Sequence, residues 1–200
     1  GTPGMLGSDP FLIVDMNGRR FTNEDIPGQS FSDLAEEQPG VVFWQIADAK
    51  YPEQMKWSSP THGAQMSFTG DIDAWNAAME TGDKDAIESM LTEQGVNLQH
   101  AWTVEELAEG IHVDAATLQE TLDRYNGFCH DGYDADFGKQ AKRLWPVENP
   151  PYFYSTSGQW AFMLTMGGLK GTEKAEAIDQ WGNPIPGLWM AGNVQGMRFA

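Results

Sequence analysis

The spacing of apolar and polar residues divides the chain into two β-rich ends and a helical middle. Near the start, two runs of β-forming residues flank the pair Asn17-Gly18. Such a pair is typical of a tight turn, because that turn requires positive φ at its central positions, so we predict a hairpin over 11–23. Residues 25–40 break the periodicity and predict a linker, and the apolar run 41–46 predicts a buried strand.

The middle of the chain has apolar residues three and four positions apart, which is typical of amphipathic helices. We predict three helices, each with a capping residue at its start and a glycine at its end: Asp83 to Gly95, Thr103 to Gly110 and Asp114 to Gly127. Thr103 and Glu106 have the spacing of a capping box. The apolar stripes are predicted to be core and not ligand surface: Ala86, Ile87, Met90, Leu91, Leu107, Ala108, Leu118, Leu122 and Tyr125.

The last part of the chain returns to β patterning. Strands are predicted at 152–156 and 160–166, after a proline-rich connector. Residues 175–192 predict a hairpin, with its turn at 179–183, that leads into a buried strand.

This order of patterns predicts an α+β protein in which one module interrupts another. Residues 26–150 would form the inserted module of helices and strands. Residues 1–25 and 151–200 would pack together as one β-rich subdomain, and function would lie where the two parts join. The 200 residues, 40% of them hydrophobic, suffice to bury a core.

Composition excludes several functions. Twelve basic and 29 acidic residues give a net charge of −17, which repels nucleic acid and anionic lipid. No stretch reaches the ~20 apolar residues of a membrane span. Cys129 is the single cysteine, and the four histidines lack metal-binding spacing, so no metal site is expected.

Three segments in this order resemble one family. They read DMNGRRFTNED at 15–25, TVEELAEGIHVDAATLQETLDRYNGFCHDGYDADFGK at 103–139, and TMGGLKGTEKAEAIDQWGNPIPGLWMAGN at 165–193. They are similar to the hairpin, the capping-domain signature and the return segment of the flavoproteins that include fumarate reductases, flavocytochrome c, urocanate reductases and 3-oxosteroid dehydrogenases. The resemblance implies that 26–150 is a capping, or substrate, domain inserted into an FAD-binding domain that 1–25 and 151–200 represent in part.

The resemblance also implies FAD as the cofactor, a small-molecule substrate, and an electron-donor domain or protein. It implies hydride transfer between the flavin and a C=C or CH–CH bond next to an activating group. The residues that match the family's cofactor contacts are Gly167, Gly168, Ala191, Gly192 and Asn193. Leu164, Thr165 and Met166 match its substrate segment. Tyr154, as a proton donor with a lowered pKa, and Arg198, as a polar group near the substrate, are the catalytic candidates.

Two departures from the family bear on the substrate. Fumarate reductases carry an arginine shortly after the Asn-Glu pair and a histidine before Thr-Met-Gly-Gly, whereas this chain has the Gly28 region and Leu164 there. Without those groups, two carboxylates would enter a closed site unpaired, at a high cost. We therefore expect a hydrophobic, conjugated substrate and not a dicarboxylate.

A glycine-rich turn between a first strand and a helix, which would hold the FAD pyrophosphate, is absent from the sequence. We therefore expect a fragment that is inactive alone, binds FAD weakly or not at all, and needs the remainder of the FAD-binding domain as its partner. The alternative is an aromatic-rich, non-catalytic module that binds carbohydrate or another protein. Its tryptophans, however, lie in different predicted elements with no shared spacing.

Overall fold

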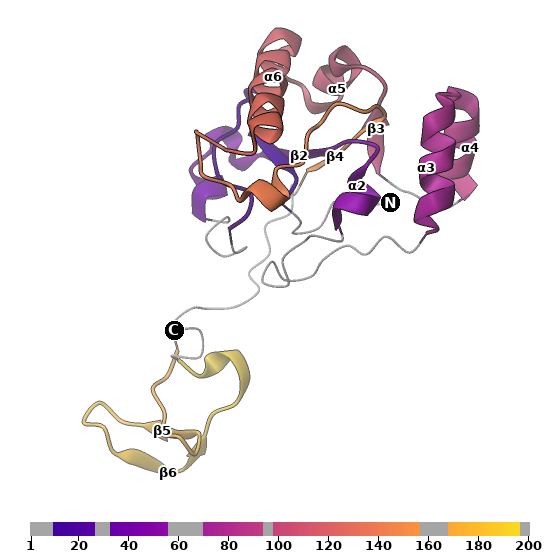
Figure 1. Cartoon of the computed structure of the whole chain (residues 1–200). Coiled ribbons are helices and arrows are strands. Elements are labelled where there is room, and N and C mark those ends of the chain that lie inside the picture. Colours follow the sequence, from indigo (N-terminus) through magenta and orange to yellow (C-terminus); the bar gives the residue numbers. More distant parts are fainter. Residues whose placement is uncertain (1–9, 27–32, 56–69, 94–97, 157–167, 197–200) are drawn as a thin grey trace. The chain divides into compact units, whose positions relative to one another are not determined.

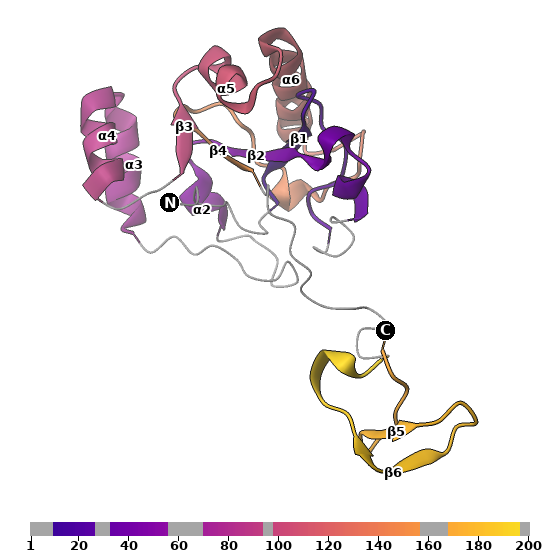
Figure 2. The same ribbon diagram turned by 180° about the vertical axis from the view of Figure 1, so that it is seen from behind.

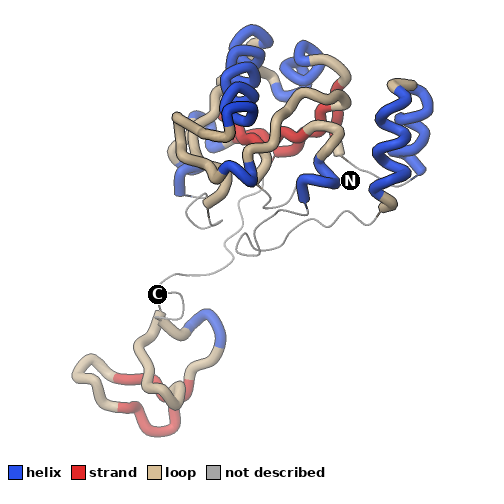
Figure 3. The backbone as a smooth tube through the Cα atoms, viewed as in Figure 1, coloured by secondary structure: helices blue, strands red, loops and turns tan. Residues whose placement is uncertain are grey.

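The computed structural model in Figure 1 describes residues 10–26, 33–55, 70–93, 98–156 and 168–196. The chain divides into two compact units, Gly1–Gly158 and Gln159–Ala200, here called the N-terminal and C-terminal units. Helices and strands both occur (Figure 3), which confirms the predicted mixture of the two. Among the described residues, none of the helices has the length and hydropathy needed to cross a bilayer.

An antiparallel four-stranded sheet lies at the centre of the N-terminal unit. Its strand order is β1-β2-β4-β3. The strands are β1 (Leu12–Asp15), β2 (Phe43–Ala47), β3 (Gln99–Ala101) and β4 (Tyr152–Thr156). The predicted module boundaries near 26 and 150 therefore both fall between strands of a single sheet. The division into a capping domain and a partial FAD-binding domain stays a prediction.

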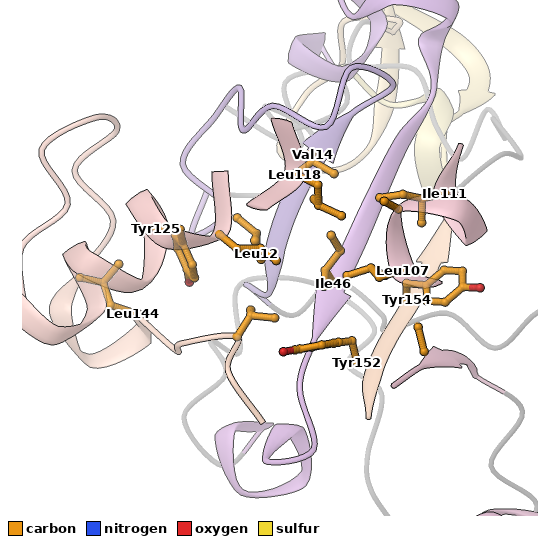
Figure 4. Packing of buried hydrophobic residues seen from close by; sticks show 14 residues of the cluster. Leu12, Val14, Ile46, Leu107, Ile111, Leu118, Tyr125, Leu144, Tyr152 and Tyr154 are labelled. Atoms are coloured by element: carbon orange, nitrogen blue, oxygen red, sulfur yellow. The ribbon is translucent and has the colours of Figure 1, made fainter. Parts of the chain in front are cut away.

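Both faces of this sheet are covered by apolar side chains. Successive side chains of a strand point to opposite faces, so each strand can contribute to two clusters. On β4, Tyr152 and Tyr154 belong to one apolar cluster, and Phe153 between them belongs to another. On β1, Leu12 lies in the first cluster and Phe11, just before the strand, in the second. Figure 4 shows the first cluster, in which side chains of the sheet meet those of the helices.

The two longest helices that pack on the first cluster are α5 (Val104–Ile111) and α6 (Ala115–Asp131), and Figures 1 and 2 show both on one side of the sheet. The second cluster receives side chains from α2 (Tyr51–Gln54), α3 (Ile72–Thr81) and α4 (Lys84–Glu93). The described residues of this unit also include two short 3-10 helices, η1 (Pro39–Val41) and η4 (Ala141–Arg143), and a helical stretch at 33–36. The predicted assignment of the helical stripes to the core is confirmed for Ile87, Leu91, Leu107, Ala108, Leu118, Leu122 and Tyr125.

The predicted helix starts are confirmed. The Asp83 carboxylate accepts the Ala86 N–H at 3.2 Å, and the Asp114 carboxylate caps α6. At α5, Thr103 Oγ1 accepts the Glu106 N–H at 3.1 Å. These caps form between neighbours in the sequence, which is why local residue types suffice to predict them.

The predicted helix ends at Gly110 and Gly127 are wrong. Both glycines lie inside helices, and α5 and α6 end one residue before His112 and Gly132, which have left-handed φ values of 59° and 66°. A Cβ at Gly110 would collide with the Tyr154 hydroxyl, whereas one at Gly127 would meet nothing within 4 Å. Gly110 is thus a packing requirement and not a stop signal. Gly95 lies outside the described residues.

The tight turn predicted near the N-terminus is present, but in another form. Gly18 has a φ of 74°, whereas Asn17 does not have positive φ. The Asp15 carboxylate instead accepts the N–H groups of Asn17 and Arg19, each at 2.9 Å. After the turn there is a single β-bridge at Arg20, and the strand that pairs fully with β1 is β2. The hydrogen bonds to the Asp15 carboxylate thus give a turn of a different form from the one predicted.

The C-terminal unit contains the predicted hairpin, built from β5 (Glu176–Ile178) and β6 (Pro184–Trp189), followed by the 3-10 helix η5 (Gly192–Val194). Its turn is held by the Asp179 carboxylate. The predicted burial of the second strand is wrong: Leu188 and Trp189 are 45% and 64% exposed. The strand predicted at 160–166 lies outside the described residues.

Candidate cofactor site

Two short segments of the C-terminal unit, one at Gly168 and one at η5, lie side by side. The Leu169 N–H donates to the Val194 carbonyl at 2.9 Å, and the Gly196 N–H donates to the Leu169 carbonyl at 2.8 Å. Leu169 and Gln195 also form a parallel β-bridge. The structure therefore brings together two of the segments that the family resemblance assigns to the cofactor.

Glycine permits this close approach. A Cβ built on Gly168 would lie 2.6 Å from the Val194 carbonyl oxygen and 2.6 Å from the Gly196 nitrogen. Both are backbone atoms, which cannot rotate away as the end of a side chain can. Gly192, at the start of η5, has a φ of 76° and open space where a Cβ would point.

The surface at this contact is backbone flanked by aliphatic side chains. Gly168 and Gly192 are exposed, and the side chains of Leu169 and Val194 are half exposed, at 54% and 50%. A flat ring system packs well on bare backbone and aliphatic groups. The described part of this contact therefore offers bare backbone and aliphatic groups to a cofactor, and its use as a flavin site stays a prediction.

Several predicted site residues lie outside the described residues: Leu164, Thr165, Met166, Gly167 and Arg198. Asn193 is part of η5, and Ala191, the residue just before η5, is exposed. The site assignments of all these residues stay predictions.

Tyr154 is in a different setting from the one expected. It is 8% exposed and belongs to the core cluster on β4 (Figure 4). Its hydroxyl packs against Gly110 of α5. Its ring lies 6.0 Å from that of Trp44. Burial raises the pKa of Tyr154, so the expected lowering of its pKa is wrong.

Sequence reasoning missed a buried charge network in the N-terminal unit. The Arg20 guanidinium donates two hydrogen bonds to Glu24, at 2.7 and 2.8 Å, and two to Asp134, at 2.9 and 2.7 Å. The Arg20 side chain is 5% exposed, and those of both acids are fully buried. Burial favours a higher pKa for Asp134, but hydrogen bonds from Arg20 outweigh it and hold the pKa below its ordinary value.

Lys139 extends this network. Its ammonium group lies 3.3 Å from the Glu24 carboxylate and donates to Tyr125 Oη at 2.9 Å and to the Pro10 carbonyl at 2.6 Å. Burial lowers the pKa of Lys139. These residues belong to the first two family-like segments, so in this structure the segments bind one another. The only signal in the sequence was that each segment carries both an acid and a base.

A pocket of about 190 Å³ lies beside this network. Its lining residues are Arg19, Arg20, Thr121, Arg124, Tyr125, Phe128 and Asp136. The Arg20 and Arg124 side chains are held by carboxylates. None of the predicted site residues lines this pocket, so it adds nothing to the cofactor site.

Comparison with known proteins gives a consistent result. Residues 4–200 match the family described as FAD binding domain. The chain is 28% identical over 194 residues to vinyl phenol reductase of Lactiplantibacillus plantarum, covering 94% of this chain and 36% of that protein. It is 31% identical over 185 residues to digoxin reductase of Eggerthella lenta, covering 92% and 29%.

Among solved structures, the chain is similar in fold to 3-ketosteroid Δ1-dehydrogenase from Sterolibacterium denitrificans. The TM-score is 0.62 at 24% identity, over 97% of this chain and 35% of that one. The chain thus spans about a third of the length of vinyl phenol reductase and of digoxin reductase.

Proposed function

Because this chain belongs to the FAD binding domain family, we propose that it forms part of an oxidoreductase that transfers hydride between FAD and a conjugated, hydrophobic C=C or CH–CH substrate. The resemblance indicated by the three segments is confirmed by this membership and by the reductases that match the chain. FAD is the cofactor of that family.

The contact between the Gly168 segment and η5 supports the cofactor assignment most directly. Hydrogen bonds hold the two segments together, and both expose backbone to solvent. When bound, the flavin supplies the centre that accepts or donates hydride. The bare backbone at Gly168 allows a ring to approach, and the half-exposed Leu169 and Val194 side chains offer apolar surface beside it.

The substrate class rests on the sequence. Leu164 and the Gly28 region replace the two charged groups with which fumarate reductases hold and protonate a dicarboxylate. Two relatives are named as reductases of vinyl phenol and of digoxin. Other relatives are named for urocanate, acrylate and fumarate, so the proposal of a hydrophobic, conjugated substrate rests on Leu164 and the Gly28 region.

We also propose that residues 26–150 act as the capping domain, and that the 200-residue chain is inactive by itself. The helices α2 to α6, whose side chains cover the sheet of the N-terminal unit, all lie within 26–150, whereas β1 and β4 of that sheet come from the parts outside it. The sequence offers no glycine-rich turn for the pyrophosphate, so the chain contributes one part of the cofactor site.

An assay of the complete protein that contains this chain tests these proposals. With reduced viologen as donor, we expect turnover of a hydroxycinnamate or a 3-oxosteroid and slow turnover of fumarate. Each missing charged hydrogen bond costs about 1.5–3 kcal/mol, or roughly one to two decades in rate. Fast fumarate reduction would refute the substrate class. A colourless protein that releases no flavin on denaturation would refute the proposal as a whole.

The alternative, a non-catalytic module that binds carbohydrate or protein, stays a prediction. Trp181 and Trp189 are 77% and 64% exposed and are available for stacking, whereas Trp75 is fully buried. A titration of the chain with oligosaccharides, followed by tryptophan fluorescence, separates this alternative from a flavoprotein role. A saturable change would favour the alternative.

A further inference from the structure

Gly196 lies in a close backbone contact that could not be predicted from the three family-like segments. A Cβ built on it would lie 2.8 Å from the Gly168 carbonyl oxygen, 3.0 Å from the Gly168 carbonyl carbon and 3.1 Å from the Leu169 carbonyl oxygen. All three are backbone atoms. With the reverse clash of Gly168 on the Gly196 nitrogen, the two glycines form a contact in which neither tolerates a side chain.

The surroundings of Gly171, in the same unit, differ from those of Gly196. A Cβ on Gly171 would collide with the terminal methyl group of Met190, which lies at the end of a flexible side chain and can rotate away. Its nearest backbone atom, the Glu176 carbonyl oxygen, lies at 3.2 Å. Adding a methyl group therefore has different consequences at Gly171 and at Gly196. At Gly196 the two backbone segments themselves must separate.

Separation would break the hydrogen bonds that join the segments. The Leu169 N–H and the Gly196 N–H are the donors of these two bonds, and both residues lie at the contact itself. A shift of a few tenths of an ångström lengthens both bonds together. It also moves the exposed backbone of Gly168 relative to η5.

We propose that Gly196 is a positioning residue of the cofactor site: its contact with Gly168 sets the spacing of the two segments on which FAD rests. This inference depends on the proposed FAD function. Gly196 acts through Gly168 and η5 and does not itself need to touch the cofactor. A side chain at position 196 weakens FAD binding because it displaces both segments.

Three variants of the complete protein test this role: Gly196→Ala, Gly168→Ala and the matched control Gly171→Ala. We expect the FAD dissociation constant, measured by flavin fluorescence, to rise at least about tenfold in the first two and by less than about twofold in the control. Melting temperatures of the apoproteins show the structural cost of each change. Unchanged FAD affinity in Gly196→Ala would overturn the proposal, as would an equal loss in Gly171→Ala.

Amide hydrogen exchange on the wild-type protein gives a second measurement that needs no variant. If the contact positions FAD, then FAD must stabilise the contact by the same coupling free energy. We expect saturating FAD to slow exchange of the Leu169 and Gly196 amides by about tenfold relative to the Asp179 amide, which bonds within the hairpin turn. Equal slowing at all three amides would overturn the proposal.

The wild-type protein separates this proposal from the one on which it depends. If the wild type binds no FAD, the proposed function fails. If the wild type binds FAD and Gly196→Ala binds it equally well, the positioning role of Gly196 fails alone.

Discussion

The two units differ in how far their apolar side chains are buried. The N-terminal unit covers both faces of its sheet and fully buries large side chains such as Trp75, Tyr125 and Phe153. In the C-terminal unit, Ala177 and Met190 are the buried hydrophobic residues among those described, while the larger side chains of the hairpin are exposed.

A two-stranded hairpin without a covering layer is marginally stable in water, whereas a sheet covered on both faces supports itself. The described part of the N-terminal unit has the covering layers that stabilise a sheet, whereas the described part of the C-terminal unit exposes backbone and apolar side chains.

The buried network should dominate the stability of the N-terminal unit. Arg20→Leu leaves the Glu24 and Asp134 carboxylates buried without their guanidinium partner, so we expect a loss of about 3–5 kcal/mol in the free energy of unfolding. Urea denaturation measures it.

The matched control is Arg124→Leu. Arg124 makes the same kind of paired contact with Asp136, but its side chain is 63% exposed, so we expect a much smaller loss than for Arg20→Leu. Equal losses for the two arginines would show that burial does not decide the strength of these pairs.

Two glycines in adjacent helices give the next effect. Gly110→Ala forces a methyl group against the Tyr154 hydroxyl and should cost about 1–3 kcal/mol. Gly127→Ala has free space and should stabilise the chain by up to about 1 kcal/mol, because alanine favours helix. Thermal unfolding of the two variants compares them, and a stabilised Gly110→Ala would contradict the packing.

These same positions show how far the sequence predicts the structure. Helix starts were predictable because a cap forms between residues three apart, as at Thr103. Helix ends were not, because Gly110 is set by a tyrosine on a distant strand. The charge network was missed for the same reason, since Arg20 and Asp134 lie 114 positions apart.

The site shows the same limit. The family resemblance assigned Gly168 and the turn at Gly192 to the cofactor, and this assignment stays a prediction. The resemblance gave no sign that Gly196 closes the contact between the two, because that depends on distances between backbone atoms. Burial of the second hairpin strand was also mispredicted, since apolar sequence alone does not state what covers a strand.

Acid should reduce the stability that the network contributes, because the pKa of Asp134 is lowered in the folded protein. Arg20 holds the pKa of Asp134 below its ordinary value in the folded protein, so the unfolded chain binds a proton more readily. Stability from this group is therefore present above about pH 4 and is lost as pH falls toward the folded pKa.

Asp134→Asn should flatten the fall in unfolding free energy below about pH 4. Asp48 is the control with the opposite sign, because burial raises its pKa and protonation in acid favours its folded form. Asp48→Asn should therefore remove a gain in stability that acid brings between about pH 4 and the raised pKa of Asp48, and should leave the slope below about pH 4 unchanged. Denaturant titrations at several pH values measure both slopes, and an unchanged slope in Asp134→Asn would contradict the role given to this pair.

The smallest effect should come from the hairpin itself. Leu188 of β6 is 45% exposed, so Leu188→Thr in the 200-residue chain should change the free energy of unfolding by about 0.5 kcal/mol or less. Leu107→Ala on α5 removes a fully buried side chain and should cost about 2–5 kcal/mol. Urea unfolding, followed by far-UV circular dichroism, compares the two. A cost for Leu188→Thr close to that of Leu107→Ala would mean that the hairpin is covered in the folded chain, and the contrast between the two units would then fail.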